Sequence, residues 1–151
     1  MLPQVHIAVS ASLSIILFGV FHSTWAALSN FLVGVLLDLD HLVEYYRTKG
    51  FTLNPLKIYR FCGFAVQRDW PPRVFFWLHA YEYVLLTALV AHAVHYHPAA
   101  VGAFIGMTQH LLLDQIGNNV GPFSYFLSYR FLNGFRCNRI LTDKLPRNRR
   151  R

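Results

Sequence analysis

Charged side chains are scarce in this chain. Only 14% of its 151 residues are Asp, Glu, Lys or Arg, whereas soluble domains average about 25%. Hydrophobic residues make up 54% and aromatic residues 16%. The length suffices for one domain with a core, so we expect a single membrane-embedded domain over residues 1–151.

Cysteine is also rare, since the chain holds only Cys62 and Cys137. They are far apart and match no zinc-binding or redox spacing, which excludes a cysteine-based site of those kinds. We interpret them as two thiols in a reducing compartment, with a disulfide between them as the alternative.

Long apolar runs, in contrast, are plentiful. The stretch from Met1 to His6 lacks Lys and Arg, which is atypical of a cleaved signal peptide, so we expect the first run to be retained as a span. The sequence predicts an all-α polytopic bundle of about four spans, at residues 5–21, 25–37 (continuing to 44), 73–91 and 99–116. The first two are short for a span, so a buried hairpin that does not cross the bilayer is the alternative.

The positive charges fall in two stretches, residues 47–73 and 130–151. The connections at residues 22–24 and 95–98 hold no Lys or Arg. By the positive-inside rule, this distribution predicts a multi-pass membrane protein with both termini in the cytoplasm.

The net charge of +7 is compatible with binding to nucleic acid or to an anionic membrane. The apolar composition favours membrane lipid as the partner, and we expect no nucleic acid. Residues 51–72 and 122–136 interleave aromatic with basic side chains, which is typical of segments lying at the headgroups, and the tail to residue 151 is basic.

Most of the acidic residues lie in or beside the apolar segments, where an ionisable side chain normally marks a functional site. Helical spacing pairs Asp38 with His41 and His110 with Asp114. His79 and Glu82 are three residues apart, so they too are expected to share one helix face.

In the four-span topology these side chains gather at the cytoplasmic ends of the helices. A set of His and carboxylate groups without Cys suits a divalent metal, with zinc the best fit and manganese or iron as alternatives. The predicted metal ligands are His6, Asp38, Asp40, His41, His79, His110 and Asp114. They exceed one tetrahedral site, so either two metals bind or some members support the ligands. Asp40 or Glu82 is predicted to accept the proton of a metal-activated water.

Other ionisable residues are interpreted as structural. His22, His92, His95 and His97 lie at the opposite end of the predicted bundle. Glu44 is expected at the surface, paired with Arg47. Asp69 and Asp143 lie among basic residues and are expected at the surface too.

The order of these elements resembles a known family. An early His6, then Asp38-Leu39-Asp40-His41, then His79, then His110-Leu111-Leu112-Leu113-Asp114 followed by Gly117 and Gly121-Pro122-Phe123, resembles the bacterial and archaeal membrane-bound metal-dependent hydrolases. One type in that family is the LexA-regulated inner-membrane hydrolase. The resemblance covers residues 6–123. The family is in turn distantly similar to zinc phospholipase C and the zinc single-strand nucleases.

The resemblance implies a helical hydrolase of the inner (cytoplasmic) membrane that cleaves phosphoesters with bound metal. It implies His110 and Asp114 as ligands, together with Asp38 and either Asp40 or His41, and His79 and His6 complete the implied site. The chain departs from the family at Leu37, where proline is usual, and at residues 74–76, where members carry His-Arg-Gly. The second departure removes a ligand.

We therefore expect a metal-dependent hydrolase acting on a phosphoester of a lipid or lipid-linked substrate. Two alternatives remain open at the level of sequence. One is a transporter or channel for a metal ion or proton, since intramembrane Asp and His also line such paths. The other is a non-catalytic membrane adaptor whose polar network only holds the helices together. Substrate and oligomeric state stay open.

Overall fold

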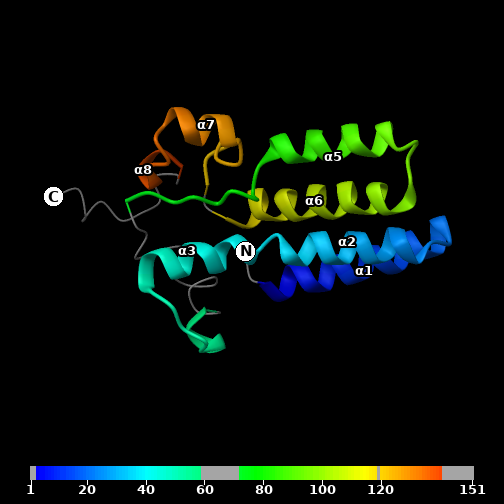
Figure 1. Cartoon of the computed structure of the whole chain (residues 1–151), viewed down its shortest axis with the longest axis horizontal. Coiled ribbons are helices and arrows are strands. Elements are labelled where there is room, and N and C mark those ends of the chain that lie inside the picture. Colours follow the sequence, from blue (N-terminus) through cyan, green and yellow to red (C-terminus); the bar gives the residue numbers. More distant parts are fainter. Residues whose placement is uncertain (1–2, 59–71, 119, 141–151) are drawn as a thin grey trace.

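The computed structural model describes residues 3–58, 72–118 and 120–140. The regular elements in these ranges are all helices, which confirms the predicted all-α class. Within them the antiparallel bridge between Arg73 and Arg136 is an isolated pair of residues rather than a sheet. Figure 1 shows a helical bundle at one end and shorter helices at the other.

The first half of the chain forms a helical hairpin followed by a break. Helix α1 (Pro3–Phe21) turns back into α2 (Thr24–Leu36), whose N-terminus is capped by the Ser23 hydroxyl. The helix is interrupted at Leu37 and Asp38, and α3 (Leu39–Lys49) continues beyond the interruption. The predicted continuous helix through Asp38 is therefore broken at the residue expected to bind metal.

The second half begins with an extended segment rather than a helix. Residues 73–80 are non-helical, and α5 starts only at Tyr81 and ends at Ala93. The prediction of a helix from residue 73 is therefore wrong. The physical reason is tertiary, because backbone groups of this segment bond to other elements: Phe75 N donates to Glu44, and Val74 N donates to the Phe135 carbonyl.

Three further helices complete the described chain. Helix α6 (Pro98–Gly117) runs back along α5 and begins with proline at its first position, where no backbone donor is lost. Helices α7 (Leu127–Leu132) and α8 (Cys137–Ile140) fold beside the end of the bundle from which α3 extends (Figure 1).

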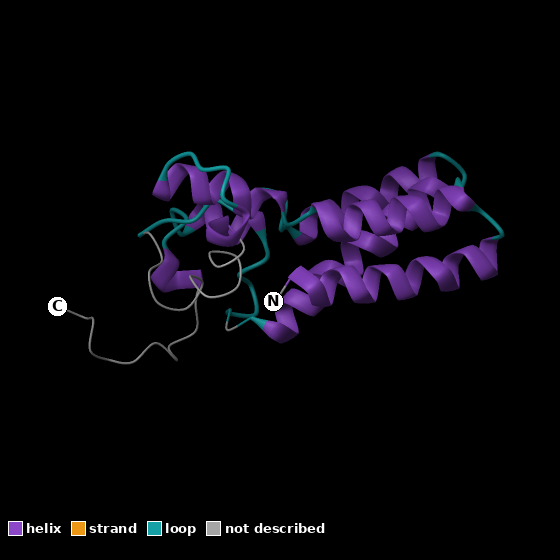
Figure 2. Cartoon of the chain, turned by 90° about the horizontal axis from the view of Figure 1, so that it is seen from below, coloured by secondary structure: helices purple, strands orange, loops and turns teal. Residues whose placement is uncertain are grey.

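Helix α6 packs against α1, α2 and α5 and so forms the centre of the bundle, which Figure 2 shows from a second side. Glycines allow α6 to approach α2 closely. A Cβ at Gly102 would lie 2.1 Å from the Ala26 carbonyl oxygen, and one at Gly106 would lie 2.5 Å from the Asn30 carbonyl oxygen. Small residues at helix contacts are typical of packing in lipid.

The bundle has polar and small residues inside and apolar residues outside. The buried residues of α1 are His6, Ser10 and Leu17, and those of α2 are Ala26, Asn30 and Gly34. Large apolar side chains face outward instead, among them Ile15 (74% exposed), Val20 (66%) and Trp25 (65%). This polarity is the reverse of that of a water-soluble helical protein.

Two helical stretches, Pro3–Phe21 and Thr24–Lys49, are long and apolar enough to cross a membrane, the second being counted through its break. They support association with a membrane.

The described basic residues lie at the end of the molecule that carries α3, α7 and α8 (Figure 1). They are Arg47, Lys49, Lys57, Arg73, Arg130, Arg136 and Arg139. In the segment 51–72, residues 55–58 form a helical turn, while residues 59–71, with Cys62 and Asp69, lie outside the described residues. The same is true of the tail 141–151, with Asp143.

Candidate metal centre

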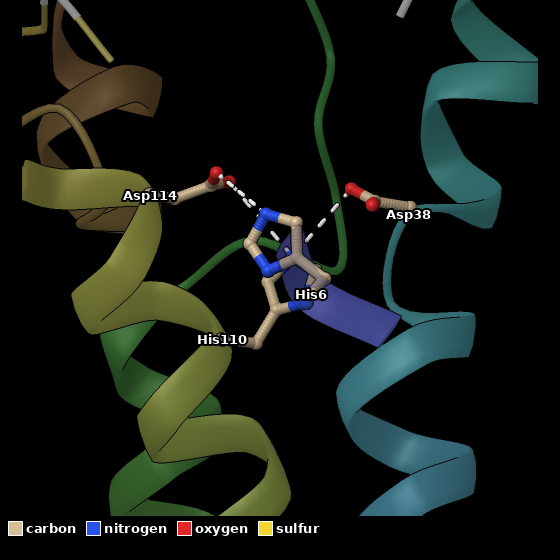
Figure 3. Close-up of side chains that lie close together, drawn as sticks. All are labelled: His6, Asp38, His110 and Asp114. Carbon is tan, nitrogen blue, oxygen red and sulfur yellow. Dashed lines mark hydrogen bonds and ion pairs between the residues drawn. The ribbon is translucent and has the colours of Figure 1, made fainter. Parts of the chain in front are cut away.

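The predicted ligands converge at the end of the bundle next to α3. His6 comes from α1, Asp38 from the break between α2 and α3, and Asp40 and His41 from the first turn of α3. His79 comes from the extended segment before α5, and His110 and Asp114 come from the last turns of α6. Figure 3 shows His6, Asp38, His110 and Asp114 pointing toward one another.

Two of the histidines are held so that the same ring nitrogen faces the centre. His110 Nδ1 lies 2.7 Å from the Gly34 carbonyl oxygen, and His79 Nδ1 lies 2.9 Å from Asp40 Oδ2. Because a carbonyl and a carboxylate only accept, both Nδ1 atoms must donate, and each neutral ring then carries its lone pair on Nε2. The two Nε2 atoms are 3.1 Å apart. At that distance the two nitrogens either share a proton in a hydrogen bond or both bind one metal ion.

Two carboxylates complete the surroundings of these nitrogens. Asp38 Oδ1 lies 3.6 Å from His79 Nε2 and 3.5 Å from His110 Nε2. Asp114 Oδ2 lies 3.3 Å and 3.8 Å from the same two atoms. Zinc bonds of about 2.0–2.1 Å in a tetrahedron separate neighbouring ligand atoms by roughly 3.3 Å. These five separations, between 3.1 and 3.8 Å, are close to that spacing.

His6 and His41 adjoin this group on either side. His6 Nε2 lies 3.1 Å from Asp114 Oδ1, and the His6 ring stacks on His110 with centroids 3.9 Å apart. His41 Nδ1 lies 3.5 Å from Asp38 Oδ1 and 3.2 Å from Asp40 Oδ1. The side chains form two groups that could each hold an ion, His6 with Asp38, His110 and Asp114, and Asp38 with His41 and His79. Asp38 belongs to both groups.

Asp40 supports His79 and lies outside both groups. Its Oδ2 accepts from His79 Nδ1 and also from the Leu78 backbone N–H at 3.1 Å. A carboxylate on the far nitrogen of a ligand histidine fixes the ring orientation and raises its basicity. This geometry favours the prediction that some members of the set support the ligands over the prediction that Asp40 itself is one.

Glu82 does not lie where helical spacing predicted it, beside His79. His79 and Glu82 do not share a helix face, because His79 precedes α5. Glu82 accepts from the backbone N–H groups of Leu127 and Ser128 and from the Ser128 hydroxyl, so it caps α7. These bonds occupy the Glu82 carboxylate and give it a structural role at the start of α7, not that of the predicted proton acceptor.

Glu44 pairs with Arg47, as predicted, but it does not lie at the surface. Its side chain is 1% exposed, and Arg47 Nη2 and Nε both contact it. The surface prediction is wrong because the extended segment covers α3, with Phe75 N donating to Glu44 Oε2 at 3.2 Å.

Two residues beside the centre have no counterpart among the sequence predictions. Tyr125 is buried and hydrogen bonds to Asp114, and burial together with the Asp114 charge raises the pKa of its phenol well above 10. Arg130 is buried on α7, where its Nη2 donates to the His79 carbonyl oxygen at 2.6 Å. Both come from a stretch read as an interfacial segment, and no spacing relates them to the His and Asp motifs.

The centre is closed on most sides. His6, His79, His110 and Asp114 are at most 1% exposed, and Asp40 is 4% exposed. The side chains of Asp38 (22%) and His41 (12%) are the most exposed of the set. Access to the centre is therefore at the α2–α3 break.

The other histidines lie elsewhere. His22, His92, His95 and His97 are exposed and lie on or next to the α1–α2 and α5–α6 connections, at the opposite end of the bundle (Figure 1). This agrees with their exclusion from the predicted site. No protein-family model, curated protein or solved structure matches this chain.

Proposed function

We propose that this chain is a membrane-bound metal-dependent hydrolase that cleaves a phosphoester of a lipid or lipid-linked substrate at the cytoplasmic face. The observation that best supports a bound metal is the distance of 3.1 Å between the Nε2 atoms of His79 and His110. Each ring has its Nδ1 bound to an acceptor, so both rings direct Nε2 to the same point. The proposed ion is divalent and is zinc by preference, with manganese or iron as alternatives.

His79, His110, Asp38 and Asp114 would hold the ion. A divalent ion so held makes its bound water acidic enough to supply hydroxide at neutral pH. Asp38 and His41 stand at the open edge, where a substrate would enter. The carboxylate oxygen of Asp40 that lies 3.2 Å from His41 Nδ1 makes no hydrogen bond within the described part of the chain. The Asp40–His41 pair is therefore the proposed acceptor of the proton released from that water.

The inverted polarity of the bundle supports the four-span arrangement. Besides α1 and α2, helix α5 exposes apolar side chains, among them Leu85 (63%), Leu86 (53%) and Leu89 (58%). Helix α6 has 20 residues, which at 1.5 Å per residue extend about 30 Å, the thickness of the hydrocarbon core. The basic residues of α3, α7 and α8 lie at the end that holds the metal centre, so the positive-inside rule puts that end in the cytoplasm.

The surroundings of the open edge favour an amphiphilic substrate. An outward stripe of Leu32, Leu36, Leu39 and Val43 runs past Asp38, each side chain 41–59% exposed. Phe76 stacks on His41, and its neighbour Trp77 is 48% exposed. Apolar side chains on these two sides of the edge suit the acyl chains of a lipid, while Arg47, Arg73 and Arg136 at the same end suit an anionic headgroup.

Membership of the membrane-bound metal-dependent hydrolase family is part of this proposal. The supporting feature is that its ordered motifs, His6, Asp38 to His41, His79, and His110 with Asp114, come together in space. At residues 74–76 the contacts to other elements are made by the backbone. The Val74 N–H donates to the Phe135 carbonyl, and the Phe75 N–H donates to the Glu44 carboxylate. The proposed centre accordingly needs no ligand from that stretch.

The first test measures the metal content of the parent protein and of His110→Ala by mass spectrometry. Both are purified in mild detergent without added metal. One or two equivalents of zinc, manganese or iron, lost in the variant, are expected. The metal-loaded protein should then release phosphate or an alcohol from an anionic phospholipid, and Asp38→Ala/His110→Ala should not. A parent protein that folds without metal, or a double variant that keeps both metal and activity, contradicts the proposal.

One feature favours the transporter alternative. Below the metal centre, α1, α2 and α6 bury a polar layer in which Gln109 hydrogen bonds to Ser10, and Asn30 donates to the Ser10 carbonyl and to Ser14 Oγ. Along the bundle away from the metal centre, the layer ends at the close contact between Gly102 and Ala26. The next buried residues in that direction are Leu17 and Ala26. Because the polar path ends inside the bundle, we rank hydrolysis first. Asp114-dependent uptake of zinc or protons by proteoliposomes would reverse this order.

A further inference from the structure

We propose that Arg130 is a positioning residue that fixes His79 in the metal centre. The inference rests on the proposed function, because it concerns how one ligand is held. Arg130 lies on α7, far from His79 in sequence, and its guanidinium donates to backbone carbonyls. Its effect would pass through the backbone that carries His79.

The Arg130 guanidinium holds both ends of the short stretch from Phe76 to His79. Nη2 donates to the His79 carbonyl oxygen at 2.6 Å, and Nη1 donates to the Phe76 carbonyl oxygen. The planar fork of arginine allows one side chain to bind two carbonyls in a fixed relation. These bonds involve a charged donor and are stronger than those between neutral groups.

The stretch held in this way lacks support from helical hydrogen bonds. Residues 74–80 are extended or bent, and several of their backbone groups bond to other elements because no helix satisfies them. Asp40 accepts from the Leu78 N–H and from the His79 ring, and Arg130 donates to the Phe76 and His79 carbonyls. Both therefore determine where His79 Nε2 points. The Phe76 ring also stacks on the His41 ring, with centroids 4.5 Å apart. Through Phe76, the same guanidinium therefore helps to position a second side chain of the centre.

Arg130 is itself held firmly. Its backbone N–H donates to the Phe126 carbonyl, and its carbonyl accepts from Phe135 N at 2.8 Å. Glu82 fixes the start of α7 through Leu127 and Ser128. The support thus runs from α5 through α7 to the segment that carries His79.

Stability alone does not account for this arginine. The side chain is 1% exposed, and its Nε has no hydrogen-bond partner in the described part of the chain. Burying a cation without full pairing is costly, and an apolar side chain of similar volume often costs less. A role in holding His79 gives a reason for the charge at this position.

The test compares Arg130→Met with Arg139→Met, a matched change at an exposed arginine, and with Arg130→Lys. Each full-length variant, purified in detergent and checked for helix content, is titrated with Zn²⁺ against a chelator and with Co²⁺ by visible absorption. We expect Arg130→Met to bind Zn²⁺ about 10- to 100-fold more weakly and to alter the Co²⁺ spectrum. Saturating Zn²⁺ should restore any hydrolysis. Arg139→Met should match the parent, and Arg130→Lys should fall between, because one ammonium cannot repeat both bonds.

Parent-like Zn²⁺ affinity and Co²⁺ spectrum in folded Arg130→Met would overturn the inference. If that variant does not fold, Arg130→Lys decides in the same way, with parent-like binding again the contrary result. Absence of Zn²⁺ and Co²⁺ binding in the parent protein would instead refute the proposed function, and the inference with it.

Discussion

The Nε2 atoms of His79 and His110 face each other at 3.1 Å, although the two residues come from different elements of the fold. The Gly34 carbonyl orients one ring and the Asp40 carboxylate orients the other. Each histidine is thus fixed from behind, which is how proteins prepare imidazoles for metal binding. Mutations can therefore distinguish residues that would bind the metal from residues that orient its histidine ligands.

Asp40→Asn should weaken metal binding without removing a ligand. An amide does not match the carboxylate as acceptor for His79 Nδ1, so the ring loses orientation and basicity. We expect metal affinity to fall about 10- to 100-fold. Chelator competition measures this change. Loss comparable with that of His110→Ala would show instead that Asp40 is itself a ligand, and unchanged affinity would show that its bond to His79 has no consequence.

Glu82→Ala should lower stability and leave the chemistry of the centre intact. The variant removes the acceptor for three donors at the start of α7, and loss of such a cap costs about 1 kcal/mol. Thermal unfolding in detergent should show the decrease, and Ser128→Ala, which removes only the hydroxyl donor, should show a smaller one. At saturating metal the rate of hydrolysis should match that of the parent. A rate lost at full metal loading would restore Glu82 as a proton acceptor.

Gly106→Leu should disrupt the bundle, whereas Gly19→Leu should be tolerated. A Cβ at Gly106 meets the Asn30 backbone, which cannot move aside like a flexible side chain, while a Cβ at Gly19 meets nothing within 4 Å. Overpacking of this kind costs about 1–3 kcal/mol or more. Size-exclusion profiles and melting temperatures in the same detergent compare the two variants. Equal behaviour would contradict the close contact between α2 and α6.

Cys137 should react slowly with maleimide at neutral pH. Burial, together with the charge of Glu44, raises the pKa of its thiol to about 12, so little thiolate is present near pH 7. Peptide mapping by mass spectrometry after timed labelling measures the rate, with unfolded protein in detergent and urea as the comparison. Labelling of the folded protein at the unfolded rate would show that Cys137 is accessible.

The sequence alone determined the all-α class and the membership of the polar cluster. Helical spacing placed His110 beside Asp114, and the polarity of the apolar segments placed His6 and Asp38 at the same end. These are local patterns, in which a period of 3.6 residues and the cost of a charge in an apolar segment leave few alternatives.

Only the tertiary structure decided how these residues are arranged. The extended segment that carries His79 and the burial of Glu44 depend on bonds between Phe75 and Glu44 and between Leu78 and Asp40. Such bonds join residues more than 30 positions apart, and no local period records them. For the same reason, the support that Arg130 gives to His79 was visible only once α7 had been brought against the segment before α5.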